Sequence, residues 1–187
     1  MQYEVEMKFP VAGLAKLETQ LRAIGATISA PEREVDVYFA HPSRDFAQTD
    51  EALRLRRKGE RFFITYKGPK IDLTTKTRQE IELPLATEEA GFPAWFQLLD
   101  AIGFRPVGEV RKSRRKATIV WQGRNVEGSL DQVEGLGPFM ELELIADAEQ
   151  VDAARENILS LAESLGLVGA EHRSYLELLM GAAGLSA

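Results

Sequence analysis

The chain has 187 residues, of which 44% are hydrophobic and 28% are charged, and it contains no cysteine. This composition is typical of a globular protein, and it excludes a disulfide framework, thiolate metal sites and a cysteine nucleophile. A net charge of −6 argues against a general role in binding nucleic acid or membrane surfaces. The two histidines, His41 and His172, are too few for a histidine-rich metal site, so a metal ion would need oxygen ligands.

The first eight residues alternate in polarity and contain no apolar stretch, so we expect no signal peptide. No apolar run approaches the roughly 20 residues that a membrane span needs. No linker rich in glycine, serine or proline divides the chain. These features predict a cytoplasmic protein in which residues 1–187 form a single domain.

Hydrophobic periodicity predicts the elements of the first half. Residues 3–9 alternate strictly and predict a strand that Pro10 ends. Residues 11–24 then predict an amphipathic helix that Gly25 closes. The polar residues 41–51 predict a loop. Further strands are expected at residues 35–39, 53–58, 62–67 and 74–83.

The second half predicts one more helix, a long hairpin, a last strand and two final helices. The first helix covers residues 93–102. The strands cover residues 108–120, 126–133 and 140–145, and the last helices cover residues 149–165 and 173–180. The sum is eight strands and four helices, which indicates an α+β fold.

The basic residues are concentrated in two segments of the chain. Residues 54–78 and 105–116 together hold 15 of the 23 lysines and arginines. Because the protein as a whole is acidic, this concentration favours a local anion-binding site over a generally basic surface.

Several predicted strands have one charged face and one apolar face. Glu4, Glu6 and Lys8 lie opposite Val5 and Met7. The other charged faces comprise Arg54 with Arg56, Lys76 and Arg78 with Glu80 and Glu82, Lys112 and Arg114 with Lys116, Glu127 with Ser129 and Asp131, and Glu141 with Glu143. The simplest interpretation is an antiparallel sheet with a solvated charged face and cross-strand ion pairs.

The ratio of strands to helices favours a second interpretation. Eight antiparallel strands can close into a barrel, and helices packed outside would then turn the charged faces inward. Like charges repel one another in such an interior unless ligands neutralise them. Carboxylates suit Mg²⁺ or Mn²⁺, arginines suit phosphate oxygens, and a metal-bound triphosphate satisfies both sets at once.

An ordered set of short motifs runs through the chain, beginning with Glu4-Val-Glu6-Met-Lys8, an E-x-E-x-K pattern. The further motifs, in chain order, are Asp36-Val-Tyr38-Phe39, Leu53-Arg54-Leu55-Arg56, Tyr66-Lys67-Gly68-Pro69, Lys112-Ser113-Arg114, Ser129-Leu130-Asp131, Val133-Glu134-Gly135-Leu136-Gly137, Glu141-Leu142-Glu143 and Ser174-Tyr175-Leu176-Glu177. This set resembles a known family in both content and order, the CYTH superfamily of class IV adenylate cyclases and thiamine triphosphatases, which belongs to the triphosphate tunnel metalloenzymes. The residues within these motifs resemble the class IV cyclases more than the animal thiamine triphosphatases.

The resemblance implies an eight-stranded closed tunnel and a role for each matching residue. The implied metal ligands are Glu4, Glu6, Asp131, Glu141 and Glu143. The implied triphosphate-binding residues are Lys8, Arg54, Arg56, Lys67, Lys76, Arg78, Lys112 and Arg114, and the catalytic candidates are Lys8, Lys67 and Tyr38. Glu80 and Glu82 fit either the site or ion pairs with Lys76 and Arg78. We expect Tyr175 to pack without touching the site.

The implied activity is metal-dependent chemistry on a triphosphate, with Mg²⁺ or Mn²⁺ as cofactor. We expect a class IV adenylate cyclase, which converts ATP to cyclic AMP and pyrophosphate. A triphosphatase acting on thiamine triphosphate or tripolyphosphate is the alternative, and a non-catalytic triphosphate-binding protein is a second one. The expected partner is a nucleoside or other triphosphate, with no nucleic acid or membrane, and the resemblance makes a homodimer plausible.

Overall fold

A computed structural model describes residues 2–70, 77–85 and 91–184 of the chain. Its strands are β1 (Gln2–Pro10), β2 (Thr27–Ile28), β3 (Glu32–Ala40), β4 (Ala52–Lys58), β5 (Arg61–Lys67), β6 (Glu80–Leu85), β7 (Arg105–Trp121), β8 (Arg124–Val133) and β9 (Gly137–Asp147). Its helices are α1 (Leu14–Ala23), α2 (Phe46–Thr49), α3 (Gly91–Ala101), the 3₁₀ turn η1 (Ala148–Gln150), α4 (Val151–Ser164) and α5 (Tyr175–Ala182).

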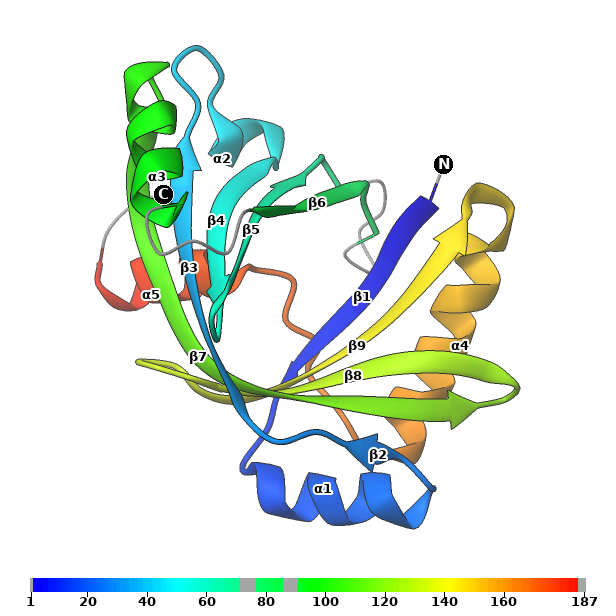
Figure 1. The fold of residues 1–187 in the computed structure, drawn as a ribbon. Helices are drawn as coiled ribbons and strands as arrows, with labels where there is room; N and C mark the ends of the chain where they lie inside the picture. Colours follow the sequence, from blue (N-terminus) through cyan, green and yellow to red (C-terminus); the bar gives the residue numbers. More distant parts are fainter. Residues whose placement is uncertain (1, 71–76, 86–90, 185–187) are drawn as a thin grey trace.

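The strands form one curled antiparallel sheet in the order β1-β9-β8-β7-β3-β4-β5-β6, and the short β2 pairs with β7 (Figure 1). The two edges of the sheet approach each other, and Glu4 and Arg78 form an isolated antiparallel bridge. The Glu4 amide donates to the Arg78 carbonyl at 3.1 Å and the Arg78 amide returns a bond at 3.2 Å. The expected α+β class and eight antiparallel strands are therefore confirmed. The strands, expected to close into a tunnel, form a curled sheet in the shape of a half-barrel, and among the described residues this one bridge links its two edges.

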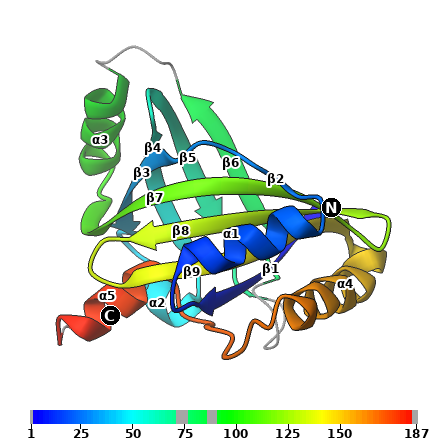
Figure 2. The same ribbon diagram turned by 90° about the horizontal axis from the view of Figure 1, so that it is seen from below.

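Helices cover the outer, convex face of the sheet, as Figure 2 shows for α1 and α4. Leu17 and Leu21 of α1 and Ile158 and Leu161 of α4 share one hydrophobic cluster with the apolar faces of β1, β7, β8 and β9. A second cluster joins α3 to β3, β4 and β5. Because the apolar side of each strand is used outside, the alternating charged side faces the hollow of the sheet.

Two sequence predictions need correction. The predicted loop 41–51 contains α2, because the Asp45 side chain caps its first turn by accepting from the Ala47 amide at 3.1 Å, and Asp50 ends it in the left-handed region with φ 56°. The predicted strand 74–83 begins as a strand at Glu80, and its residues 74–76 lie outside the described residues. None of the helices described has the length and apolarity to cross a lipid bilayer.

Candidate functional site: a charged cavity inside the curled sheet

The concave side of the sheet encloses a cavity of about 1170 Å³. Each of the eight long strands contributes charged or polar side chains to its wall, because these residues occupy alternate positions along the strands. The charged lining residues on and beside the strands are Glu4, Glu6, Lys8, Glu34, Arg54, Arg56, Lys58, Lys67, Arg78, Glu80, Glu82, Lys112, Arg114, Lys116, Glu127, Glu141 and Glu143.

One side of the cavity, the basic wall, is built from Arg54 and Arg56 of β4 and Lys112 and Arg114 of β7. Asp36 of the intervening strand β3 holds three of these cations. Arg56 binds it through two nitrogens at 2.7 and 2.8 Å, Lys112 donates at 3.3 Å, and Arg54 lies 3.7 Å away. Burial alone would raise the pKa of Asp36, but Lys112, Arg56 and Arg54 outweigh it and hold that pKa well below its ordinary value.

Glu34, also on β3, lies one layer further along the basic wall. Its carboxylate is 3.3 Å from Lys112, 3.7 Å from Arg56 and from Lys58, and 3.9 Å from Arg114. Burial would raise its pKa, yet Arg114, Lys112 and Arg56 lower it to about 2. Both Glu34 carboxylate oxygens are buried and accept no hydrogen bond. This carboxylate therefore balances the charge of the surrounding cations without accepting hydrogen bonds from their N–H groups.

The opposite side, the acidic wall, carries a row of three carboxylates on adjacent strands. In the sheet register Glu143 of β9 pairs with Glu6 of β1 on one side and with Glu127 of β8 on the other. Like charges directly opposite one another destabilise a sheet. Burial raises the pKa of Glu143, with further repulsion from Glu127 and Glu6, although Lys116 and Lys67 act against it.

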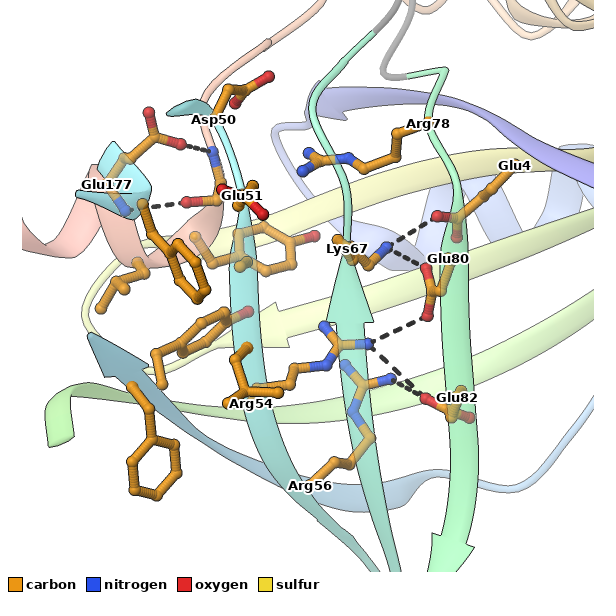
Figure 3. Close-up of a pocket in the computed structure, with 18 of the residues that line it drawn as sticks. Glu4, Asp50, Glu51, Arg54, Arg56, Lys67, Arg78, Glu80, Glu82 and Glu177 are labelled. Atoms are coloured by element: carbon orange, nitrogen blue, oxygen red, sulfur yellow. Dashed lines mark hydrogen bonds and ion pairs between the residues drawn. The ribbon is translucent and has the colours of Figure 1, made fainter. Parts of the chain in front are cut away.

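Glu4 continues the acidic wall towards the bridge between the sheet edges. Burial raises its pKa well above the ordinary value, despite the ammonium group of Lys67 at 2.8 Å (Figure 3). Lys67 also lies 2.5 Å from Glu80 and 3.9 Å from Glu6. Burial would lower the pKa of Lys67, but the carboxylates Glu4, Glu80 and Glu6 raise it. These carboxylates therefore favour the protonated form of Lys67, and its catalytic role stays a prediction.

The donor chemistry of the acidic wall fits a divalent metal ion. Hard carboxylate oxygens are what Mg²⁺ and Mn²⁺ prefer. Burial raises the pKa values of Glu4 and Glu143, and a bound cation would favour their ionised forms. Over the described residues no three acidic or histidine side chains converge as a ready-made metal site. Lys67 and Lys116 instead contact Glu4, Glu6 and Glu127.

Helix α5 adds residues that sequence reasoning had assigned only to packing. The Tyr175 hydroxyl donates to Asp131 at 2.9 Å, and Asp131 in turn accepts from Arg114 at 2.6 Å. The ammonium group of Lys8 lies 4.2 Å from the centre of the Tyr175 ring and donates to the Arg173 carbonyl, while that of Lys112 lies 5.5 Å from the ring. The Tyr175 ring therefore lies beside the cations Lys8 and Lys112, and its hydroxyl binds Asp131, the carboxylate that holds Arg114.

Most predicted site residues are brought together around the cavity. Asp131 is the exception, because it is fully buried behind Arg114 and its oxygens are engaged by Arg114 and Tyr175. We therefore regard Asp131 as the anchor of Arg114 and leave it out of the metal site proposed below. Lys76 lies outside the described residues.

Glu80 and Glu82, whose roles the sequence left open, contact cations of the cavity. Arg54 lies 3.7 Å from Glu80 and 3.8 Å from Glu82, and Arg56 lies 4.0 Å from Glu82 (Figure 3). The residues missed as candidates are Glu34, Asp36, Lys58, Lys116 and Glu127. The sequence could have identified them, because each lies an even number of residues from a predicted site residue on the same strand and therefore shares its face of the sheet.

The sequence of this chain matches a known protein family and named relatives. The CYTH domain model matches residues 2–175. The chain belongs to the CYTH family. A protein of Methanocaldococcus jannaschii named "Putative adenylate cyclase MJ0240" is 38% identical over 178 residues, which cover 94% of this chain and 97% of that protein.

Solved structures of other proteins resemble this chain over almost its whole length. The PH1819 protein of Pyrococcus horikoshii OT3 has a TM-score of 0.83 at 40% identity, covering 96% of this chain and 99% of the other. HpAC1 of Hippeastrum, described as having a dominant triphosphatase activity, shares the fold with a TM-score of 0.61 at 16% identity, covering 100% of this chain and 98% of the other. The fold that surrounds the charged cavity is therefore shared with solved structures.

Proposed function

We propose that this CYTH protein is a divalent-metal-dependent enzyme that acts on a triphosphate, and that it is a class IV adenylate cyclase converting ATP to cyclic AMP and pyrophosphate. The observation that carries the proposal is the pairing of two walls across one cavity. The fixed cations of the basic wall and the carboxylates of the acidic wall line the same cavity, and burial raises the pKa values of two of these carboxylates, Glu4 and Glu143. A metal-bound triphosphate supplies both the anion and the cation that these walls need.

The basic wall would hold the phosphate chain. Arg54, Arg56, Lys112 and Arg114 are buried and are already fixed by Asp36, Glu34 and Asp131. They therefore lose little conformational entropy when they bind phosphate oxygens, and their charge stabilises the transition state of phosphoryl or nucleotidyl transfer. Lys8, held between the Arg173 carbonyl and the Tyr175 ring, approaches the same chain from β1.

The acidic wall would hold the metal ion, through Glu4, Glu6, Glu141 and Glu143. The ion would offset charge on the leaving group. In the cyclase reaction the ribose 3′-hydroxyl attacks the α-phosphorus and pyrophosphate leaves. The name of the Methanocaldococcus relative supports this assignment.

A triphosphatase, in which water attacks the γ-phosphorus, is the alternative. The activity described for the Hippeastrum protein favours it, since that protein shares this fold. The two activities need the same metal and phosphate contacts and differ in which phosphorus meets the nucleophile.

Product analysis separates the two activities. The purified protein is incubated with ATP or with tripolyphosphate, each with Mg²⁺ or Mn²⁺, beside Glu6→Gln and the exposed control Glu149→Gln. We expect cyclic AMP and pyrophosphate from ATP, lost in Glu6→Gln and retained in Glu149→Gln. Inorganic phosphate without cyclic AMP would establish the triphosphatase instead. No product with either substrate, together with metal-dependent binding, would mean a binding protein.

A further inference from the structure

Lys67 lies where the two edges of the curled sheet meet. In the sheet register Lys67 of β5 pairs with Glu80 of β6, and the backbone bridge between Glu4 and Arg78 brings β1 beside β6. Figure 3 shows the ammonium group of Lys67 between the carboxylates of Glu4 and Glu80. Only 14% of the Lys67 side chain is exposed. The fold therefore encloses this ammonium group between carboxylates from both edges.

The contacts of this ammonium group overlap with the proposed metal ligands. It donates to Glu4 at 2.8 Å and lies 3.9 Å from Glu6, and both residues belong to that ligand set. Mg²⁺ and Mn²⁺ bind directly to carboxylate oxygens. An ion held by Glu4 would therefore stand close to the ammonium group, and two positive charges repel at such a distance. Lys67 and a metal ion thus compete for the same oxygen atoms.

Arg114 of the basic wall also contacts a proposed metal ligand, Glu141, but it is held differently. Asp131, which lies outside the proposed ligand set, accepts two hydrogen bonds from Arg114. Arg114 would therefore stay in place when Glu141 binds a metal ion. The described ion pairs of Lys67 include one carboxylate outside the ligand set, Glu80 at 2.5 Å. Metal binding would thus rearrange the contacts of Lys67 more than those of Arg114.

Lys67 can leave Glu4 without leaving the cavity. Lysine carries its ammonium group on a flexible four-carbon stem. Glu80 lies 3.7 Å from Arg54 of the basic wall. An ammonium group that stays beside Glu80 is therefore next to the cations proposed to hold the phosphate chain. Phosphate oxygens would replace the oxygens of Glu4 and Glu6 as its hydrogen-bond acceptors.

We propose that Lys67 competes with the metal ion for Glu4 and Glu6, and that a triphosphate relieves this competition by drawing the ammonium group onto its own oxygens. The inference rests on the proposed function, because it assigns the metal to the acidic wall and the triphosphate to the basic wall. It makes Lys67 a residue that couples the two ligands. Because such coupling is reciprocal, the metal ion also strengthens the contribution of Lys67 to triphosphate binding.

The first test measures the Mn²⁺ dissociation constant by electron paramagnetic resonance, without a phosphate ligand. Lys67→Met removes the competing ammonium group and keeps a side chain of similar length. Lys58→Met is the matched control, because Lys58 also lines the cavity and pairs with Glu34 at 3.7 Å and Glu32 at 3.9 Å, neither of which is a proposed metal ligand. Both variants lose one positive charge from the same cavity.

We expect Mn²⁺ to bind about tenfold more tightly to Lys67→Met than to the wild-type protein, and less than twofold more tightly to Lys58→Met. Equal tightening in the two variants would mean that only the net charge matters. That result, or an unchanged Mn²⁺ dissociation constant in Lys67→Met, would overturn this inference and leave the proposed metal site standing.

The second test measures the reciprocal effect by isothermal titration with tripolyphosphate, in EDTA and with Ca²⁺ in place of Mg²⁺ to slow turnover. We expect Lys67→Met to raise the tripolyphosphate dissociation constant about tenfold with Ca²⁺ and less than threefold in EDTA. An equal rise in both conditions would overturn the coupling while leaving the proposed function standing. Failure of the wild-type protein to bind tripolyphosphate with metal would overturn both.

A crystal structure of the wild-type protein with Mn²⁺ and tripolyphosphate provides a test that does not depend on the folding of a variant. We expect the Lys67 Nζ atom to have left hydrogen-bonding distance of Glu4 and to contact a phosphate oxygen. A Lys67 ammonium group that still donates to Glu4 in that complex would overturn the inference.

Discussion

The two walls of the cavity are built from the same kinds of residue but differ in how their charges are balanced. On the basic wall, Asp36 and Glu34 sit among cations and have lowered pKa values, so each charge has a partner within the protein. On the acidic wall, Glu4 and Glu143 have raised pKa values in spite of nearby lysines. The cations of the basic wall are therefore fixed by protein carboxylates without a ligand. On the acidic wall burial disfavours the ionised forms of Glu4 and Glu143, and a bound cation would favour them.

Removing the central carboxylate of the basic wall should have the largest effect. Asp36→Asn leaves Arg54, Arg56 and Lys112 as buried cations without their main counter-charge. We expect a loss of about 3–5 kcal/mol in the free energy of unfolding, measured by urea denaturation. Asp152→Asn, which breaks an exposed pair with Arg155, should stay within about 0.5 kcal/mol. Equal losses in the two variants would contradict the organised basic wall.

The stability contributions of carboxylates on the two walls should depend on pH in opposite directions. The pKa of Glu34 falls from 4.5 to about 2 on folding, so its contribution is fully present above pH 4.5 and is lost as the pH falls towards 2. The shift corresponds to roughly 3 kcal/mol. Urea denaturation between pH 6 and pH 3 should therefore show a shallower loss of stability in Glu34→Gln than in the wild-type protein. Parallel curves would show that Glu34 does not titrate in this way.

The acidic wall should respond in the opposite direction. Because the pKa of Glu143 is raised on folding, its ionised form opposes folding at neutral pH, and stability is regained as the pH falls through that pKa. Glu143→Gln should thus melt at or above the wild-type temperature without metal. Mn²⁺ at 100 times its dissociation constant should stabilise the wild-type protein by about 2.7 kcal/mol and the variant far less. Equal metal-induced shifts in both proteins would remove Glu143 from the metal site.

The link between α5 and the basic wall should give the smallest effect. Tyr175→Phe keeps the ring beside Lys8 and loses the hydrogen bond to Asp131, so we expect about 1 kcal/mol less stability and a KM for the triphosphate raised a few-fold. Tyr175→Leu also removes the ring and should raise KM further. A fall in stability with KM unchanged in both variants would assign Tyr175 to packing alone.

Much of this arrangement was predictable because strand residues alternate. The charged spacing of Glu4, Glu6 and Lys8, and of Arg54 with Arg56, identified one face of each strand, and the family motifs indicated its function. The sequence did not indicate which partners from distant parts of the chain a side chain would meet. Asp131 was assigned to a metal, yet Arg114 and Tyr175 engage it, and that pairing depends on how β7, β8 and α5 meet.

By itself the sequence determined which residues are charged, which face of each strand they share, and the strand and helix content, because these follow from local periodicity and composition. Only the tertiary structure decided how the charges are balanced. Lys67 lies among Glu4, Glu6 and Glu80, and the register of β3 with β7 shifts between Tyr38 and Phe39. The physical reason is that pKa values and contacts depend on burial and on neighbours across the sheet, which alternation along one strand does not specify.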